Sequence, residues 1–312
     1  MELISVLMPV YNVASYVSEA IESILKQTYT NFEFIIIDDC STDGTFAICE
    51  GYARKDNRIV LLHNEQNLKI EDSLNRGLAH CHGKFVIRMD GDDVSLPDRL
   101  EKLKCFLDEH KEISLVGTSV ENIDSNGNSL GYTIYPDDWS FILKTCTLKI
   151  PLGHIWMTYK SVYDDLKGYR KLFGTEDWDF LLRFMSKGYK CTNISDYFGN
   201  KMRLNRAGNS SSVFGAKKLK SKAYTVKMYK ERLKNKKDSY SLQNAEKYVH
   251  SFPLEQKLYA LSSKTLYKAI SCRANKNIVG MIFFLLCSLI SPLQVKYLCD
   301  VLKYKIIAGT LR

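Results

Sequence analysis

The sequence predicts an α/β fold with a mostly parallel central sheet, followed by a helical C-terminal extension. Strand-like apolar runs alternate with amphipathic helical segments along the first hundred residues, and the connections between them are short. This alternation is typical of right-handed βαβ units. In addition, three of the expected strands end in polar or acidic residues. Ligands of such sheets bind beyond the carboxyl ends of the strands, so these residues mark the expected site.

Each expected element follows from its own pattern. Residues 4–10 form a short, continuous apolar run, which indicates a strand buried on both faces. The apolar side chains of residues 15–27 recur on one helical face. The following expectations alternate in the same way: strand 34–37, helix 42–54, strand 59–62, helix 71–80, strand 85–89, helix 97–110 with a proline in its first turn, and strand 114–120.

The pattern is less regular beyond residue 120. Turn signals occur at Asn126-Gly127, at Pro136-Asp137 and at 151–153. A helix is expected over 176–187, and residues 216–312 are expected to be mainly helical. We therefore predict a main domain over 1–215, divided near residue 120, and a separate basic helical region over 216–312.

Composition excludes several classes of protein. The 312 residues are 45% hydrophobic and 25% charged, which excludes a disordered chain, a collagen-like chain and a multi-span membrane protein. The net charge of +9 is local, because ten Lys or Arg and one acid lie between Lys217 and Lys237. Nine cysteines without a CxxC pair, and a start without a visible secretory signal, lead us to expect a cytoplasmic chain.

The first acidic motif is Asp90-Gly91-Asp92-Asp93. Crowded carboxylates repel one another, and a divalent cation removes that repulsion while offering open positions to phosphate oxygens. Gly91 allows a tight backbone path and close approach of a ligand. The alternative is an acidic turn that caps the next helix through Asp98. The motif alone leaves both interpretations open.

Two further acidic segments are candidates for the site. A carboxylate of Asp38-Asp39 could accept an N–H from a nucleobase, while the residues after it, 41–43, could cap the next helix. Glu176 and Asp177 begin the late helix, where the helix dipole favours acids. Either carboxylate could also act as a general base, if it is held near a substrate hydroxyl.

These motifs resemble family 2 glycosyltransferases, which have the GT-A fold and use nucleotide sugars with inversion. The resemblance covers about residues 3–212. It implies transfer of one sugar with a divalent metal, Mn2+ or Mg2+, and makes 1–120 the nucleotide-binding half and 121–215 the acceptor-binding half. The stretches that carry it are VLMPVYN, ESILKQTYTNFEFIIIDDCSTDGT, FVIRMDGDDVSLPDRL and GTEDWDFLLR.

The resemblance gives the donor-binding positions expected roles. Pro9, Val10, Tyr11 and Asn12 form the loop that is implied to lie against the base and ribose, with Tyr11 as a stacking surface. Asp39 is implied to hydrogen-bond the base, which suggests uracil and therefore a UDP-sugar donor.

The resemblance also assigns the metal motif. Asp92 is implied to bind the metal directly, and Asp90 to lie near the ribose and the cation. Gly91 separates them within the nucleotide-binding loop, and Asp93 is the third acid.

The resemblance makes Asp177 the general base, with Glu176 beside it. No QxxRW motif is present, which favours transfer of a single sugar over polymerisation. By the same resemblance, three further positions are candidates for contacts with the donor phosphates: His154, Arg203 and Arg206. Trp178, which the acids of the late helix flank, is a further candidate site residue.

Other function classes fit less well. The segment after the first strand has no glycine or basic residue to hold a triphosphate, and no GxxxxGK[ST] motif is present. The basic segment has no array of stacking aromatics, so no nucleic-acid partner is expected. A catalytically inactive sugar-nucleotide-binding or scaffold protein of a polysaccharide assembly complex is the alternative, although Asp92 and Asp177 are both present.

The C-terminal region suggests where the chain acts. Residues 217–237 could form a basic amphipathic helix at an anionic membrane surface, or a solvated helical face. The apolar run 278–290 is shorter than the ~20 residues of a spanning helix, so it is expected to be buried or interfacial. We expect peripheral association with the cytosolic face of the plasma membrane. Such a location suits a lipid-linked saccharide acceptor in polysaccharide, O-antigen or capsule synthesis.

Overall fold

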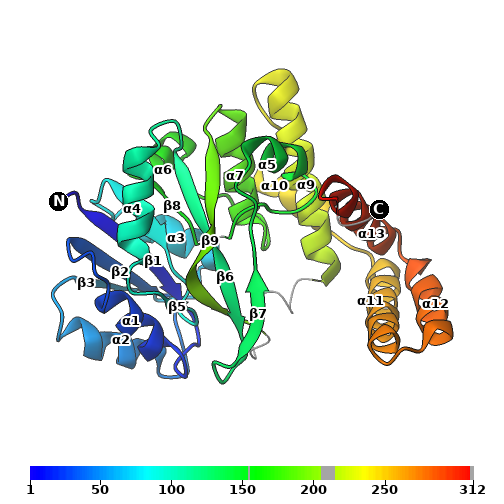
Figure 1. The fold of residues 1–312 in the computed structure, drawn as a ribbon, viewed down its shortest axis with the longest axis horizontal. Coiled ribbons are helices and arrows are strands. Elements are labelled where there is room, and N and C mark those ends of the chain that lie inside the picture. Colours follow the sequence, from blue (N-terminus) through cyan, green and yellow to red (C-terminus); the bar gives the residue numbers. More distant parts are fainter. Residues whose placement is uncertain (154, 205–214, 310–312) are drawn as a thin grey trace. The chain divides into compact units, whose positions relative to one another are not determined.

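The computed structural model describes residues 1–153, 155–204 and 215–309 (Figure 1). The chain forms two compact units. The sheet unit comprises Met1–Lys144, Pro151–Lys171 and Glu176–Asn209. The helical unit comprises Thr145–Ile150, Leu172–Thr175 and Ser210–Arg312.

The sheet unit is built on one mixed sheet. In the described part of the chain it has nine strands in the order β3-β2-β1-β4-β8-β6-β9-β5, with β7 paired to β6. The strands are β1 (Ile4–Val10), β2 (Phe32–Asp38), β3 (Ile59–His63), β4 (Phe85–Arg88), β5 (Val94–Ser95), β6 (Leu115–Ile123), β7 (Ser129–Thr133), β8 (Met157–Tyr159) and β9 (Cys191–Arg203).

The predicted parallel arrangement is confirmed in the first four strands of this order. β3, β2, β1 and β4 are parallel neighbours, and Val10 at the end of β1 pairs with Asp38 at the end of β2. The other half is mixed, because β8 lies antiparallel between β4 and β6, whereas β6 and β9 are parallel. The carboxyl ends of β1, β2 and β4 therefore meet at one edge.

Seven helices accompany the sheet among the described residues. Where a helix was expected, its observed ends lie within three residues of the expected ends. Asp43 helps to start α2, since its Oδ1 accepts the Thr45 N–H at 3.1 Å. The helices are α1 (Val17–Leu25), α2 (Thr45–Ala53), α3 (Ile70–Leu78), α4 (Arg99–Glu109), α5 (Trp139–Thr145), α6 (Lys160–Leu166) and α7 (Glu176–Ser186).

The proposed cap at Asp98 is wrong. Asp98 occupies the N-cap position of α4, but its side chain makes no cap hydrogen bond. Its carboxylate instead accepts the Tyr197 hydroxyl and pairs with Lys102 at 2.9 Å. A phenol and an ammonium group thus compete successfully with the helix N–H groups for this carboxylate.

Helices cover both faces of the parallel strands, which explains their continuous apolar sequences. Val6 and Met8 of β1 belong to a buried core that includes apolar residues of α1 and α4. On the other face, Gly77 of α3 lies against Leu7, where a Cβ would come within 2.3 Å of the leucine Cδ1. Burial on both faces fixes β1 and thereby the position of the loop that follows it.

The helical unit has a small core. Tyr224, Met228 and Ala245 pack with Leu172. Across residues 1–153, 155–204 and 215–309, no single helix is long and apolar enough to cross a membrane; residues 278–290 and 292–307 pass that test only as a pair bent by 119°. The elements are α9 (Gly215–Asn235), α10 (Leu242–Val249), α11 (Pro253–Ala274), α12 (Ile278–Cys287), the short 3-10 helix η1 (Ser288–Ile290) and α13 (Pro292–Ile307).

Candidate active site

The loops after β1 and β2 are joined at the carboxyl edge of the sheet. The Asn12 N–H donates to Ser41 Oγ at 3.0 Å, and the Thr42 N–H donates to Asn12 Oδ1 at 2.8 Å. Asn12 has a φ of 50°, a left-handed conformation that asparagine tolerates better than most residues. These bonds make the two loops one surface.

The four residues expected beside the base and ribose differ in exposure. Pro9 and Val10 are buried at the end of β1, whereas Tyr11 is 47% exposed. Asn12 is half-buried and holds the loop. Tyr11 is therefore the residue of this group whose ring is accessible to a ligand, and the other three residues hold it in position.

Asp39 is a buried carboxylate that organises the next loop. Its Oδ1 accepts hydrogen bonds from Asn64 Nδ2 at 2.8 Å and from the Leu68 N–H at 2.7 Å, and its Oδ2 accepts the Lys69 N–H at 3.0 Å. A carboxylate has about four acceptor positions, so one position at Oδ2 is left for a ligand N–H. The contribution of residues 64–69 to this site was not predicted from the sequence.

The first acidic motif is separated from the end of β4 by one residue. Gly91 packs against the end of β1, and a Cβ at this position would lie 2.6 Å from Val10 Cγ1. Glycine is therefore required by close packing rather than by its φ. The contact places Asp90 and Asp92 at the same edge as the loop after β1.

Arg203 fixes the backbone of this acidic motif. Its N–H donates to Asp93 Oδ1 at 2.8 Å and its Nε donates to the Asp92 carbonyl at 2.9 Å. The same guanidinium reaches Glu19 at 2.7 Å and the Asp124 carbonyl at 2.9 Å. Arg203 is thus a positioning residue in this structure, and its contact with donor phosphates stays a prediction.

Arg88, at the end of β4, links the two acidic motifs. Its side chain is 5% exposed; its Nε lies 3.3 Å from Asp90 Oδ1, and its NH1 lies 3.6 Å from Glu176 Oε1. Burial alone would lower the pKa of Arg88, but the charges of Asp90, Glu176 and Asp177 outweigh burial and raise it. Arg88 was not predicted as a site residue, although an arginine inside an apolar strand is a visible signal.

Glu176 and Asp177 begin α7 in different environments. Glu176 is buried, and burial followed by the charge of Asp177 raises its pKa to about 7, against the opposing effect of Arg88. Asp177 and Trp178 are half-buried, and Asp177 Oδ1 accepts the Trp178 N–H at 2.7 Å. The more accessible carboxylate is therefore Asp177, and the one held by the buried arginine is Glu176.

The residues present fit a divalent cation that shares its ligands with a substrate. Among the described residues, no group of three or more His, Cys, Asp or Glu could hold a metal ion. Asp90 and Asp92 supply carboxylate oxygens, which Mg2+ and Mn2+ prefer. Mg2+ is commonly held by one or two carboxylates together with substrate phosphates, and two acids at the carboxyl edge of the sheet suit that mode. His154 and Arg206 lie outside the described residues.

Comparisons with known proteins agree with this architecture. The family model described as "Glycosyl transferase family 2" matches residues 5–176. The glycosyltransferase EpsE of Bacillus subtilis is 40% identical over 197 residues, which are 62% of this chain and 70% of EpsE. The O-antigen biosynthesis glycosyltransferase WbnJ of Escherichia coli is 34% identical over 201 residues, 62% of this chain and 75% of WbnJ.

A solved structure shows the same fold. The crystal structure of S. aureus TarS 1–349 in complex with UDP-GlcNAc matches with a TM-score of 0.62 and 20% identity, over 91% of this chain and 90% of that chain. The common architecture is GT-A, with helices following the sheet-based domain.

Proposed function

Because the chain belongs to glycosyl transferase family 2, we propose that this glycosyltransferase moves one sugar from a UDP-sugar to an acceptor hydroxyl with inversion. The observation that carries the proposal is the cluster of two acidic motifs joined by Arg88 at the carboxyl edge of the sheet. One motif suits a cation and the other a base.

The donor side of the site supports a uracil nucleotide. The Tyr11 ring is exposed in the loop after β1, which is bonded to the loop after β2, and the remaining acceptor position of Asp39 can take the N–H of uracil. TarS, which has the same fold, binds UDP-GlcNAc in its crystal structure. Asp90 and Asp92 would hold Mn2+ or Mg2+, whose charge would stabilise the leaving diphosphate.

The transfer follows from the position of Asp177 at the start of α7. Its carboxylate takes the proton of the acceptor hydroxyl as the oxygen forms a bond to the anomeric carbon. The bond from that carbon to the diphosphate oxygen breaks, and UDP leaves with the electron pair. Since this is one in-line displacement, the configuration inverts. Glu176 is held by Arg88 and positions the helix end rather than meeting the acceptor.

The acceptor is proposed to be a lipid-linked saccharide of surface polysaccharide synthesis. WbnJ is named for O-antigen biosynthesis, which supports this assignment. We place the protein in the cytoplasm, peripherally bound to the cytosolic face of the plasma membrane, with the basic segment 217–237 near anionic lipid. A basic region in an otherwise balanced chain supports this location.

Calorimetric titration of UDP, with and without Mn2+, tests the donor site. We expect Mn2+-dependent binding to the wild type and its loss in Asp92→Ala. Asp177→Asn should keep UDP binding but lose about 10²–10⁴-fold in turnover, as expected for a general base. Binding of another nucleoside diphosphate in place of UDP would overturn the uracil assignment. If no nucleotide binds with metal, a non-catalytic scaffold becomes the better explanation.

A further inference from the structure

Two groups of lysines on α9 make different contacts, and the first group holds the helical unit together. Lys220 donates to the His250 carbonyl and pairs with Glu255, both at 2.6 Å. Lys222 donates to the Leu148 carbonyl at 2.7 Å and pairs with Asp300 at 3.0 Å. These two lysines therefore form intramolecular ion pairs and hydrogen bonds that stabilise the helical unit.

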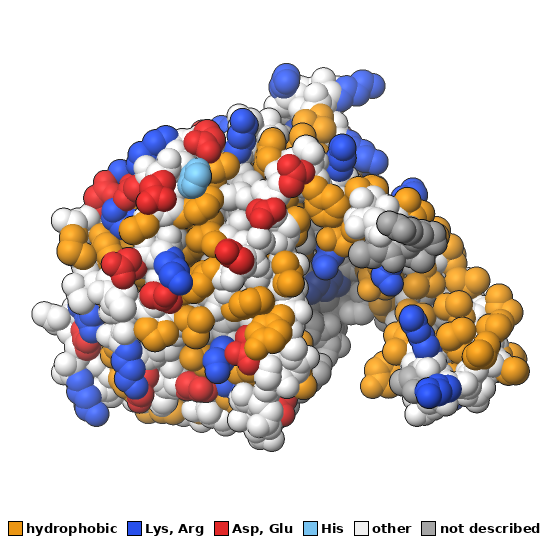
Figure 2. Space-filling view, viewed as in Figure 1, with side chains coloured by type: hydrophobic (Ala, Val, Ile, Leu, Met, Phe, Trp, Pro, Cys, Tyr) orange, Lys and Arg blue, Asp and Glu red, His pale blue; other side chains and the backbone are white. Residues whose placement is uncertain are grey.

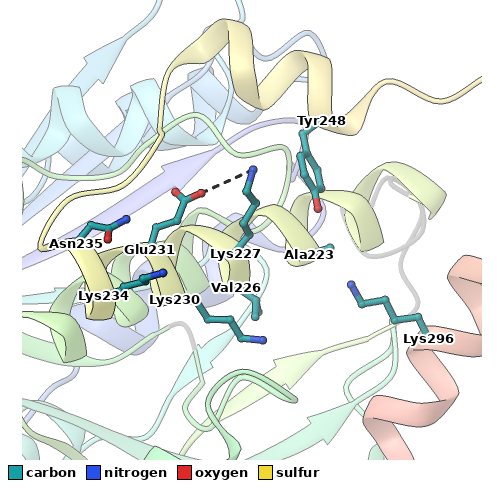
Figure 3. Close-up of a pocket in the computed structure, with 9 residues that line it drawn as sticks. All are labelled: Ala223, Val226, Lys227, Lys230, Glu231, Lys234, Asn235, Tyr248 and Lys296. Atoms are coloured by element: carbon teal, nitrogen blue, oxygen red, sulfur yellow. Dashed lines mark ion pairs between the residues drawn. The ribbon is translucent and has the colours of Figure 1, made fainter.

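The second group lines a hollow of about 550 Å³ (Figure 3). Lys227, Lys230 and Lys234 recur at i, i+3 and i+7 and therefore share one face of α9. Lys296 of α13 extends toward Lys230 from the other side of the hollow, and the Tyr248 ring lies at its rim.

The hollow carries an excess of positive charge. Its one lining acid, Glu231, lies 3.7 Å from Lys227. Within the described ranges, no carboxylate forms an ion pair with Lys230, Lys234 or Lys296. Four ammonium groups around one carboxylate suit a compact anion with several acceptor oxygens, such as a phosphate group.

The same unit exposes an unusual amount of apolar surface. None of the residues 278–287, all of them described, is buried. Val279 is 80% exposed, Phe283 60% and Leu286 62%, and these residues recur at i, i+4 and i+7. Figure 2 shows hydrophobic side chains gathered over α11 and α12. A large exposed apolar patch marks an interaction surface, and an apolar face within a basic region is typical of helices that lie in a lipid interface.

We propose that the hollow lined by Lys227, Lys230, Lys234 and Lys296 binds the phosphate group of an anionic lipid, while the exposed face of α12 lies in the interfacial layer of the same bilayer. A free phosphate would use the hollow alone and leave the apolar face without a role. The eight Lys or Arg and two acids of residues 252–309 add attraction for the same surface. The inference rests on the proposed function only for the membrane location, because lipid binding does not require catalysis.

Vesicle co-sedimentation of the full chain tests the inference. We expect binding to phosphatidylcholine vesicles that contain phosphatidylglycerol, and weaker binding to phosphatidylcholine alone. The double variant K230E/K296E should weaken binding to the anionic vesicles by at least about 30-fold, since each surface lysine contributes about fivefold. The control K55E/K190E removes the same charge from exposed positions of the sheet unit and should lose much less. Equal losses in both variants would overturn the hollow as a site.

Two further arms separate the parts of the inference. V279D/F283D should weaken binding to both kinds of vesicle, because it removes the apolar contact; unchanged binding would overturn the role of α12. Inorganic pyrophosphate should displace the wild type from anionic vesicles more strongly than sodium chloride of equal ionic strength, and equal effects would show only diffuse attraction. UDP titration of the same variants should be unchanged, so a failure of lipid binding remains distinct from a failure of the donor site.

Discussion

The sheet unit and the helical unit use charged and apolar residues in opposite ways. In the sheet unit, Arg88 and Arg203 are 4% and 3% exposed and are surrounded by carboxylates and carbonyl oxygens. In the helical unit, Lys230 and Lys234 are exposed around a hollow. The same contrast holds for apolar residues, since Val6 is 0% exposed and Val279 is 80% exposed.

This difference separates two kinds of site. A site for bond making needs side chains held in one geometry, and buried ion pairs supply that at a high cost if one partner is lost. The affinity of a protein surface for a bilayer depends on its total charge and its total apolar area, so each single residue contributes less. Substitutions of the buried arginines in the sheet unit should therefore have large effects on stability. Substitutions of the lysines around the hollow and of the exposed apolar residues of α12 should have small ones.

The largest expected effect is that of Arg88→Met. Loss of the guanidinium leaves the buried Glu176 beside Asp177 without its cation, and removing one partner of a buried pair costs about 3–5 kcal/mol. Urea unfolding should show this loss, and the double variant R88M/E176Q should recover part of it. Lys296→Met in the helical unit is the matched control and should change stability by about 0.5 kcal/mol or less. Equal losses of stability in R88M and K296M would contradict the contrast between the buried arginine and the exposed lysine.

The raised pKa of Glu176 predicts a pH dependence of stability. Its pKa rises from 4.5 to about 7 on folding, so between these values the folded state binds more protons than the unfolded state. Stability from this group is full below pH 4.5 and declines as the pH rises to about 7, by about 3 kcal/mol at most. Unfolding free energies measured across this range should show the decline, and Glu176→Gln should remove it. A decline of the same size in E176Q would assign it to other groups.

Gly91→Ala should have an intermediate effect. The added Cβ would clash with Val10 Cγ1, and overpacking of this kind costs about 1–3 kcal/mol. Thermal unfolding should show a lower Tm, and Val10→Ala in the same chain should restore part of it. The control is Gly51→Ala in α2, where a Cβ meets no atom within 4 Å. It should be neutral or slightly stabilising, because alanine is the better helix former.

The smallest expected effect is that of Val279→Asp. An exposed apolar side chain loses little when it becomes polar, so the free energy of unfolding in the absence of lipid should change by about 0.5 kcal/mol or less. Urea unfolding of Val6→Asp, measured in the same way, should show a severe loss of stability, because the aspartate would be buried without a partner. A loss above 2 kcal/mol in V279D would mean that α12 is packed against protein.

The sequence was sufficient wherever a local pattern decides the structure. β1 spans the predicted residues 4–10, and the predicted turn at Asn126-Gly127 separates β6 from β7, with Gly127 at φ 86°. The sequence also predicted that the polar ends of β1, β2 and β4 lie together, because neighbouring parallel strands end at the same edge of a sheet.

What the sequence did not predict depends on contacts between distant segments. The antiparallel β8 lies between β4 and β6, which come much earlier in the chain. Arg88 and Glu176 are also far apart in the sequence but form an ion pair, and the loop 64–69 folds onto Asp39. In the basic segment, the spacing of lysines did not distinguish Lys220, which binds Glu255, from Lys230, which lines the hollow.

One guanidinium serving two carboxylates has a consequence for communication between the motifs. Any ligand that changes the charge at Asp90 changes the field that Arg88 offers to Glu176, and so changes the proton affinity of Glu176. Thermodynamic reciprocity then requires that protonation of Glu176 change the affinity for that ligand by the same factor. The arginine thus couples occupancy at one end of the site to proton uptake at the other, without any movement of the backbone.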